Sequence, residues 1–268
     1  MSGYELRLRA PLAARLDLSR VTPQNLGNLS LNEVERLPLP YGTARVALGE
    51  LFEVLPASEG VLLLWGDSRM DFVGAGLASG DLMVTGAIGA FAGARMSGGR
   101  LVLGSDAGEG IGSGMSGGRI DVLGDAGARL AGPLPGERIG MTGGTIAIRG
   151  HAGALAGVSM RGGLVLICGD VAEGAARGMV AGTIAIAGTL GPQAGAGMKR
   201  GTLLLAREPL LLGPGFGDAG EHDLIALQLL VRRIPEIAAF FGGGVSGRAR
   251  RYVGDRLAGG QGELLWLY

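Results

Sequence analysis

The sequence predicts an all-β solenoid, a right-handed parallel β-helix of 19-residue coils, with small N- and C-terminal capping segments that contain short helices. Three observations predict this fold. Two aliphatic columns repeat along the chain, and glycine supplies 54 of 268 residues, which disfavours a helical solenoid because each helical glycine costs about 1 kcal/mol. Methionine recurs with a regular period, at Met96, Met115, Met141, Met160, Met179 and Met198.

The aliphatic columns define the strands. Each copy carries two aliphatic residues two positions apart, a spacing that places both on one face of a strand. The first column contains Leu82, Leu101, Ile120, Ile146, Val165, Ile184 and Leu203, and the second contains Val84, Leu103, Val122, Ile148, Ile167, Ile186 and Leu205. The column between them includes Asp121, and an unpaired carboxylate is not expected in a narrow apolar core. We therefore expect the intervening column to point outward.

The repeat divides the chain into three parts. The β-helix is expected over residues 58–206, beginning with a degenerate coil at Glu59-Gly-Val-Leu-Leu-Leu-Trp-Gly. Residues 1–57 and 207–268 are expected to be the capping segments. Such caps are needed because each open end of a coil stack exposes unpaired backbone groups.

Both capping segments carry helix signals. In the first, Thr22-Pro23 and Asn32 indicate helix starts. In the second, an apolar run predicts a helix that begins at Asp223 and ends before Pro235. His222, just before that run, is expected to help cap the helix.

Charge and hydropathy exclude two classes of partner. The 24 basic and 24 acidic residues balance, so no net field attracts nucleic acid or an anionic membrane. Residues 178–198 carry no charge, but they repeat the pattern of their charged neighbours and contain Pro192, which favours one more coil over a membrane span. Residues 1–16 lack the apolar segment of a signal peptide.

The sequence predicts no catalytic, cofactor-binding or metal-ligating residue. With Cys168 as the single cysteine and two histidines, the chain cannot form an intrachain disulfide or the usual zinc or iron–sulfur ligand sets, which favours a cytoplasmic protein. Cys168 follows a strand and is expected to be a buried thiol, and His151 is expected in a turn. Gly112-Ser-Gly-Met-Ser-Gly117 matches the dinucleotide fingerprint formally, but it falls inside the glycine-rich repeat and predicts no nucleotide site.

A partner interface is the candidate functional site. Five apolar residues are expected on one outer sheet face, where a monomer seldom exposes such a patch: Met83, Val102, Leu164, Leu166 and Leu204. The copy that begins at Met115 also carries a seven-residue insertion, expected to form a protruding loop. Its candidate contact residues are Pro133, Pro135, Glu137 and Arg138. The alternative is that this loop is a local insertion that contacts no partner.

The run Gly108-Glu-Gly-Ile-Gly-Ser-Gly114 resembles the GXGXG domain, which occurs in the glutamate synthase large subunit and in the C subunit of formylmethanofuran dehydrogenase. Together with Gly49-Glu-Leu-Phe-Glu-Val54 and residues 254–265, it looks like the second setting, over essentially the whole chain. The arginine-rich composition is most similar to the bacterial branch, the C subunit of the formyltransferase/hydrolase complex of methylotrophs.

The resemblance implies a non-catalytic structural subunit. Its complex would convert formyl-tetrahydromethanopterin through formylmethanofuran to formate in one-carbon oxidation. The implied partners are an amidohydrolase-like hydrolase subunit, a formyltransferase subunit and a dehydrogenase-B-like subunit, which would hold the methanofuran-type carrier and any metal ions.

Three alternatives stay open. The first is the C subunit of an archaeal molybdenum or tungsten formylmethanofuran dehydrogenase. The second is a structural domain like that of glutamate synthase. The third is a free-standing β-helix enzyme, which would need Asp, Arg or His clustered in an outer groove.

Overall fold

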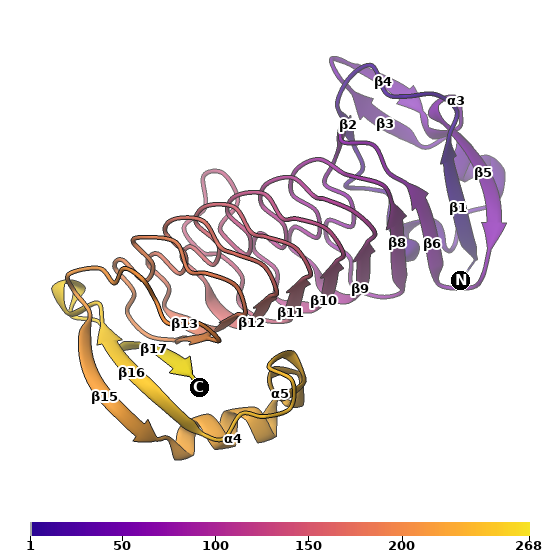
Figure 1. Cartoon of the computed structure of the whole chain (residues 1–268). Coiled ribbons are helices and arrows are strands. Elements are labelled where there is room, and N and C mark those ends of the chain that lie inside the picture. Colours follow the sequence, from indigo (N-terminus) through magenta and orange to yellow (C-terminus); the bar gives the residue numbers. More distant parts are fainter. Residues whose placement is uncertain (1) are drawn as a thin grey trace.

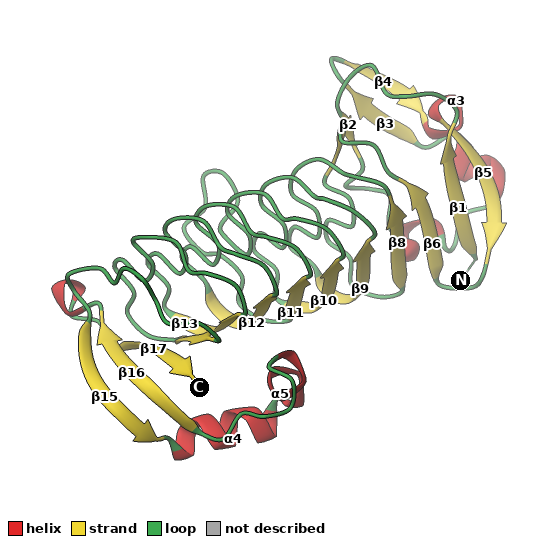
Figure 2. Ribbon diagram, in the orientation of Figure 1, coloured by secondary structure: helices red, strands yellow, loops and turns green. Residues whose placement is uncertain are grey.

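A computed structural model describes residues 2–268. The chain forms a row of stacked coils with an N-terminal segment at one end and a C-terminal segment at the other (Figure 1). Figure 2 shows that strands line one side of the row and that helices are confined to the two terminal segments. The coil strands are β6 (Val61–Trp65), β8 (Asp81–Thr85), β9 (Ser97–Leu103), β10 (Gly117–Val122), β11 (Thr145–Ile148), β12 (Arg161–Ile167), β13 (Ala181–Ile186) and β14 (Thr202–Leu205).

The coil strands pair side by side and in parallel. Leu82 pairs with Leu101 and Leu101 with Ile120, so partners are separated by the period of the repeat. The insertion lengthens one step, from Ile120 to Ile146. These pairs confirm the prediction of a mostly β chain with a long parallel sheet. Right-handed winding and a uniform 19-residue coil stay predictions.

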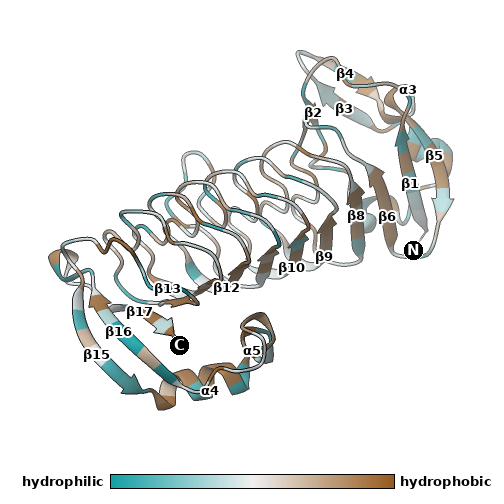
Figure 3. Cartoon of the chain, viewed as in Figure 1, coloured by the Kyte–Doolittle hydropathy of each residue, from teal (hydrophilic) through white to brown (hydrophobic). Residues whose placement is uncertain are grey.

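The core lies inside the coils. Every residue of the first aliphatic column and every repeat methionine from Met96 to Met198 is 0% exposed. A second side of the coils is joined by single bridges, also in parallel, at Ile88, Ala107, Ala126, Ala152, Val171 and Leu190. In Figure 3 the coil strands are brown, the colour of hydrophobic residues. The phase that Asp121 indicated is confirmed, since its neighbours Ile120 and Val122 are buried and Asp121 is not.

The glycine motif serves the stacking of the coils. Gly110, Gly112 and Gly114 have φ angles of +73°, +65° and +66°, a region that favours glycine. Their N–H groups alternate, because Gly110 and Gly114 donate to the following coil and Gly112 donates to the preceding coil. A Cβ on Gly112 would lie 2.4 Å from Ile146 Cδ1. The motif therefore has a structural explanation that needs no nucleotide.

One corner carries a ladder of polar side chains. Asp106 Oδ1 accepts the backbone N–H of Asp125, and Asp125 Oδ1 accepts that of His151, at 2.8 and 2.7 Å. His151 Nδ1 continues the ladder by accepting the N–H of Asp170 at 2.9 Å. Asp170 accepts from Thr189, and this hydrogen bond lowers the pKa of the Asp170 carboxyl. His151 thus links two coils in the turn where the sequence placed it.

The N-terminal segment extends the main sheet and closes one end of the core. Strand β1 (Gly3–Leu8) pairs in parallel with β6, and β5 (Phe52–Ala57) pairs with β1. A second sheet has the order β4-β3-β2-β7, with bounds Ala44–Ala47, Pro38–Tyr41, Leu16–Asp17 and Met70–Asp71. The helices are α1 (Pro23–Leu26), α2 (Leu31–Glu35) and α3 (Leu48–Leu51). Helix α2 begins one residue before the expected Asn32, because Ser30 and Glu33 form its capping box.

The C-terminal segment returns to the main sheet. Its strands are β15 (Gly217–Asp223), β16 (Arg248–Gly254) and β17 (Gly262–Leu267), with a 3-10 helix at Arg256–Ala258. Strand β17 pairs in parallel with β14, so the 13-stranded sheet runs β15-β16-β17-β14 and onward to β6-β1-β5.

Two helices lie between β15 and β16: α4 (Ile225–Arg233) and α5 (Pro235–Phe240). The expected helix start at Asp223 is wrong, because Asp223 and His222 belong to β15. The chain also remains helical after Pro235, because proline is tolerated in the first turn of a helix.

Candidate interaction surface

One row of side chains crosses the outer face of the sheet. The residues of this row occupy paired positions on successive strands. They are Leu63, Met83, Val102, Asp121, Ala147, Leu166, Ala185, Leu204 and Leu265. The row starts apolar, with Leu63 of β6 half-buried and Met83 of β8 exposed, becomes charged at β10, and is apolar and buried from β12 onward.

The C-terminal half of this face is covered by the chain itself. Leu164, Leu166 and Leu204 are 4%, 6% and 0% exposed. They form a second apolar cluster with Leu227 of α4 and Ile237 of α5. The prediction that these three leucines are exposed on an outer face is therefore wrong, because residues 224–247, outside the repeat, fold back over this face of the sheet.

The covering helices cross the strands. Leu227 lines a cleft with Leu265 of β17, and Ile234 lines another with Leu164 of β12. At the far end of α5, Phe240 lies beside Leu166. The helices α4 and α5, which we call the arm, thus run from the C-terminal strands toward β10, as Figure 1 also shows.

Within residues 2–268, no segment covers the N-terminal half of the same face. Trp65, Met83 and Leu123 are 51%, 39% and 55% exposed, whereas Leu63 and Val102 are half-buried. We call these five residues the open face. Met83 and Val102 belong to the predicted interface, and the structure adds Leu63, Trp65 and Leu123.

Trp65 is held in place by its own chain. Its Nε1–H donates to Glu5 Oε1 at 3.2 Å, and the Arg7 guanidinium lies 5.9 Å from the ring centroid. Arg7 Nε also donates to Glu5 at 2.7 Å. Hydrogen bonds from Arg7 and then Trp65 lower the pKa of the Glu5 carboxyl. An exposed aromatic ring is therefore restrained before any partner binds.

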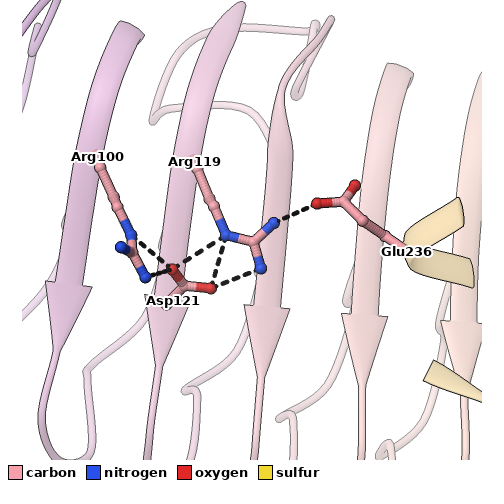
Figure 4. A network of polar contacts seen from close by, with 4 residues as sticks. All are labelled: Arg100, Arg119, Asp121 and Glu236. Atoms are coloured by element: carbon pink, nitrogen blue, oxygen red, sulfur yellow. Dashed lines mark hydrogen bonds and ion pairs between the residues drawn. The ribbon is translucent and has the colours of Figure 1, made fainter. Parts of the chain in front are cut away.

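An ionic network marks the border between the open and covered halves (Figure 4). Arg119 donates from Nε to both oxygens of Asp121, at 2.9 and 3.0 Å, and from Nη1 to Glu236 of α5 at 2.6 Å. Arg100, one coil earlier, donates to Asp121 Oδ2 at 3.0 and 3.1 Å. Hydrogen bonding to Asp121 raises the pKa of the Arg119 guanidinium. Arg119 thus joins the arm to the coil strands.

The seven-residue insertion forms a loop that rises from the row of coils in Figure 1. Pro135, Glu137 and Arg138 are exposed as expected, but Pro133 is buried. Pro133 lies at the base of the loop, where its carbonyl accepts a hydrogen bond from Arg129. Glu137 pairs with Arg95 of a neighbouring coil. The loop is therefore partly tied to the coils.

A cleft of ≈ 240 Å³ lies between α5 and the sheet. It is lined by Arg119, Arg149, Cys168, Glu236 and Phe240, among others. Cys168 is half-buried, because it lines this cleft, and not fully buried as expected. Across residues 2–268, no three His, Cys, Asp or Glu side chains are grouped so that they could hold a metal ion. Within that described part of the chain, no helix is long and apolar enough to cross a membrane.

Comparison with known proteins gives a structural match over nearly the whole chain. A chain in the crystal structure of the formyltransferase/hydrolase complex from Methylorubrum extorquens, solved with methylofuran, matches with a TM-score of 0.91 and 37% identity. The match covers 98% of this chain and 99% of that one. The C subunit of the same organism's formyltransferase/hydrolase complex is 41% identical over 87 residues. This chain belongs to the family of formyltransferase/hydrolase complex C subunits, called the C-subunit family below.

The sequence alignments with two curated C subunits each span about a third of this chain. The 87 aligned residues make up 31% of this chain and 32% of the Methylorubrum protein. The C subunit of molybdenum-containing formylmethanofuran dehydrogenase 1 from Methanothermobacter thermautotrophicus is 31% identical over 90 residues, 32% of this chain and 22% of that protein. No family model matches the sequence. The structural match, in contrast, includes both terminal segments and hence the arm.

Sequence reasoning missed three parts of the surface in this member of the C-subunit family: Trp65, Leu123 and Glu236. The outward position of Trp65 could have been predicted, since Trp65 follows Leu63 by two positions in the first coil and must lie on the same face of the strand. Leu123 lies just beyond β10 and Glu236 lies in the arm. No periodicity in the sequence links Glu236 to Arg119, which lies far earlier in the chain.

Proposed function

We propose that this chain is the non-catalytic structural subunit of a formyltransferase/hydrolase complex. That complex would convert formyl-tetrahydromethanopterin, through a formylmethanofuran-type carrier, to formate in one-carbon oxidation. The observation that carries the proposal is the match over 99% of a chain of the Methylorubrum complex. Assignment to a molybdenum dehydrogenase has weaker support, from 31% identity over a shorter share of its relative.

The proposed partners are an amidohydrolase-like hydrolase subunit, a formyltransferase subunit and a dehydrogenase-B-like subunit, assembled in the cytoplasm. Formyl transfer and hydrolysis would take place in those subunits, which would hold the carrier and any metal ions. Two findings support a structural role for this chain. The exposed carboxylates of Glu137 and Glu236 form ion pairs and those of Asp106 and Asp170 belong to a hydrogen-bond ladder between coils, and the glycine motif serves coil stacking.

The architecture proposed for this role is a stiff right-handed β-helix of 19-residue coils. Pairing of equivalent positions in successive copies of the repeat supports it. We place the β-helix at residues 58–206, between capping segments at 1–57 and 207–268. Partner contacts are proposed at the open face and at the exposed loop residues Pro135, Glu137 and Arg138.

The test is affinity purification of the tagged chain from its own cells, with the associated subunits identified by mass. The purified assembly should release formate from formyl-tetrahydromethanopterin, and the isolated chain should not. Recovery of molybdopterin and iron–sulfur polypeptides would instead indicate the dehydrogenase. Turnover by the isolated chain would overturn the structural role and favour a free-standing β-helix enzyme.

A further inference from the structure

The open face continues a surface whose other half already has an occupant. Met83 and Val102 lie in the same outward row as Leu166 and Leu204, on strands joined by one continuous hydrogen-bonded sheet. The covered half therefore shows, within one molecule, which kind of element this sheet face accepts.

That occupant is a pair of short amphipathic helices. They cross the strands, bury Leu227 and Ile237 against the sheet, and place Glu236 on Arg119. Burial of apolar area supplies the affinity, and the carboxylate sets the position of the helix along the sheet.

Arg100 repeats the position of Arg119 one coil earlier, since the two residues pair directly in β9 and β10. Arg100 uses Nε and Nη2 on Asp121 and its side chain is 52% exposed. It can therefore receive a second carboxylate, as Arg119 receives Glu236. The open face thus offers both components of the covered half, an apolar strip and a basic residue beside it.

Trp65 adds a restrained anchor. Tryptophan is enriched among residues that dominate binding energy at protein interfaces. Because Glu5 and Arg7 already hold the ring, little side-chain entropy would be lost when a partner packs against it.

We propose that the open face docks an amphipathic helix of another subunit of the complex, with apolar residues on Trp65 and Met83 and a carboxylate on Arg100. This inference rests on the proposed function. The face spans β6, β8, β9 and β10. At about 4.8 Å per strand this width is on the order of 14 Å, which fits a helix of roughly 10 residues.

A second copy of this chain is a poorer occupant. Among residues 2–268, the longest helix is α4, with 9 residues, and its buried side is already packed on its own sheet. The outer side of α4 exposes Ile225 and Leu229 but ends in Arg232 and Arg233, which would repel Arg100.

The first test uses the tagged Met83→Asp variant, expressed in the protein's own cells. A charge at this exposed position should leave folding intact but should lower recovery of the partner subunits by about tenfold or more. Leu211→Asp is the matched control, because Leu211 is 67% exposed and lies outside the open face. Unchanged recovery with Met83→Asp would overturn the inference, and equal melting temperatures of the two isolated variants exclude misfolding.

The second test identifies the occupant. A photo-crosslinking residue in place of Met83 should capture one partner subunit, through a segment with apolar residues at helical spacing and a carboxylate on its polar face. Restored recovery when Arg100→Glu is combined with reversal of that carboxylate would assign the contact. Capture of a second copy of this chain, or of a segment without that pattern, would overturn the inference.

The outcomes separate the two proposals. If the unmodified chain recovers no formyltransferase or hydrolase subunit, the proposed function fails. If it recovers them and Met83→Asp recovers them equally well, the function stands and only the docking surface is wrong.

Discussion

Met83 and Leu204 occupy the same outward row of the same sheet, yet Met83 is 39% exposed and Leu204 is fully buried. The coils around them are built alike, with parallel partners at equivalent positions of neighbouring copies. The difference comes from the arm, which covers β11 to β14 and stops at Arg119 of β10. The repeat determines which side chains point outward, and a segment outside the repeat determines which of them remain exposed.

Removal of the arm should have the largest effect on the difference in exposure between the two halves of this sheet face. Asp223 and Arg248 are paired across the β15–β16 hairpin, so residues 224–247 can be replaced by a two-residue Asn-Gly turn. The shortened chain should expose the covered leucines and self-associate, because a large apolar patch on a monomer promotes aggregation. Light scattering and binding of a hydrophobic dye measure this.

Polar substitution of the uncovered leucines is the control for the shortened chain. Leu164→Ser, Leu166→Thr and Leu204→Thr together should restore a monomer. If the shortened chain is monomeric without these changes, the arm is not what keeps the covered half of the face from associating.

Truncation of a single side chain should affect the free energy of unfolding very differently at the two ends of the row. Leu204→Ala should lower the free energy of unfolding by about 2–5 kcal/mol, because it leaves a cavity beneath the arm. Met83→Ala should change it by no more than about 0.5 kcal/mol, since its side chain is already in contact with water. Urea unfolding of the two variants measures both values, and equal losses would mean that the two halves are covered alike.

The coil strands were predictable from sequence because their signals are local. Two aliphatic residues two positions apart, recurring in every copy of the repeat, define a strand and its inward face, and Asp121 alone sets which column points out. Stacking then follows, since equivalent residues of successive coils must pair. The phase was therefore correct at every strand from β8 to β14.

The cover over Leu164, Leu166 and Leu204 was not predictable in the same way. Nothing near Leu166 in sequence distinguishes it from Met83, because burial of Leu166 depends on Phe240, which lies outside the repeat and much later in the chain. The apolar run at 224–231 predicted a helix, but not whether it would close the end of the stack or cross its side. The candidate interface consequently included residues that the chain covers itself.

The ion pair between Arg119 and Glu236 should contribute modestly to closure of the arm. Both side chains are more than a third exposed, so a double-mutant cycle with Arg119→Gln and Glu236→Gln should give a coupling of about 0.2–1 kcal/mol. Hydrogen exchange should meanwhile increase in α5 and remain unchanged in β8. A coupling of several kcal/mol would mean that the pair, and not the apolar cluster, holds the arm.

The smallest expected effect is a pH-dependent change in the ordering of Trp65 on the open face. Glu5 holds Trp65, and the hydrogen bonds from Arg7 and Trp65 depress its pKa below the ordinary value of 4.5. A depressed carboxyl pKa means that the contact is fully present above pH 4.5 and is lost as the pH falls through the lower, folded-state pKa. In a Trp266→Phe background, Trp65 fluorescence anisotropy should fall in that acidic range. Glu5→Gln keeps a carbonyl acceptor but cannot titrate, so its anisotropy should stay flat, and a transition that persists in Glu5→Gln would assign the ordering of Trp65 to another group.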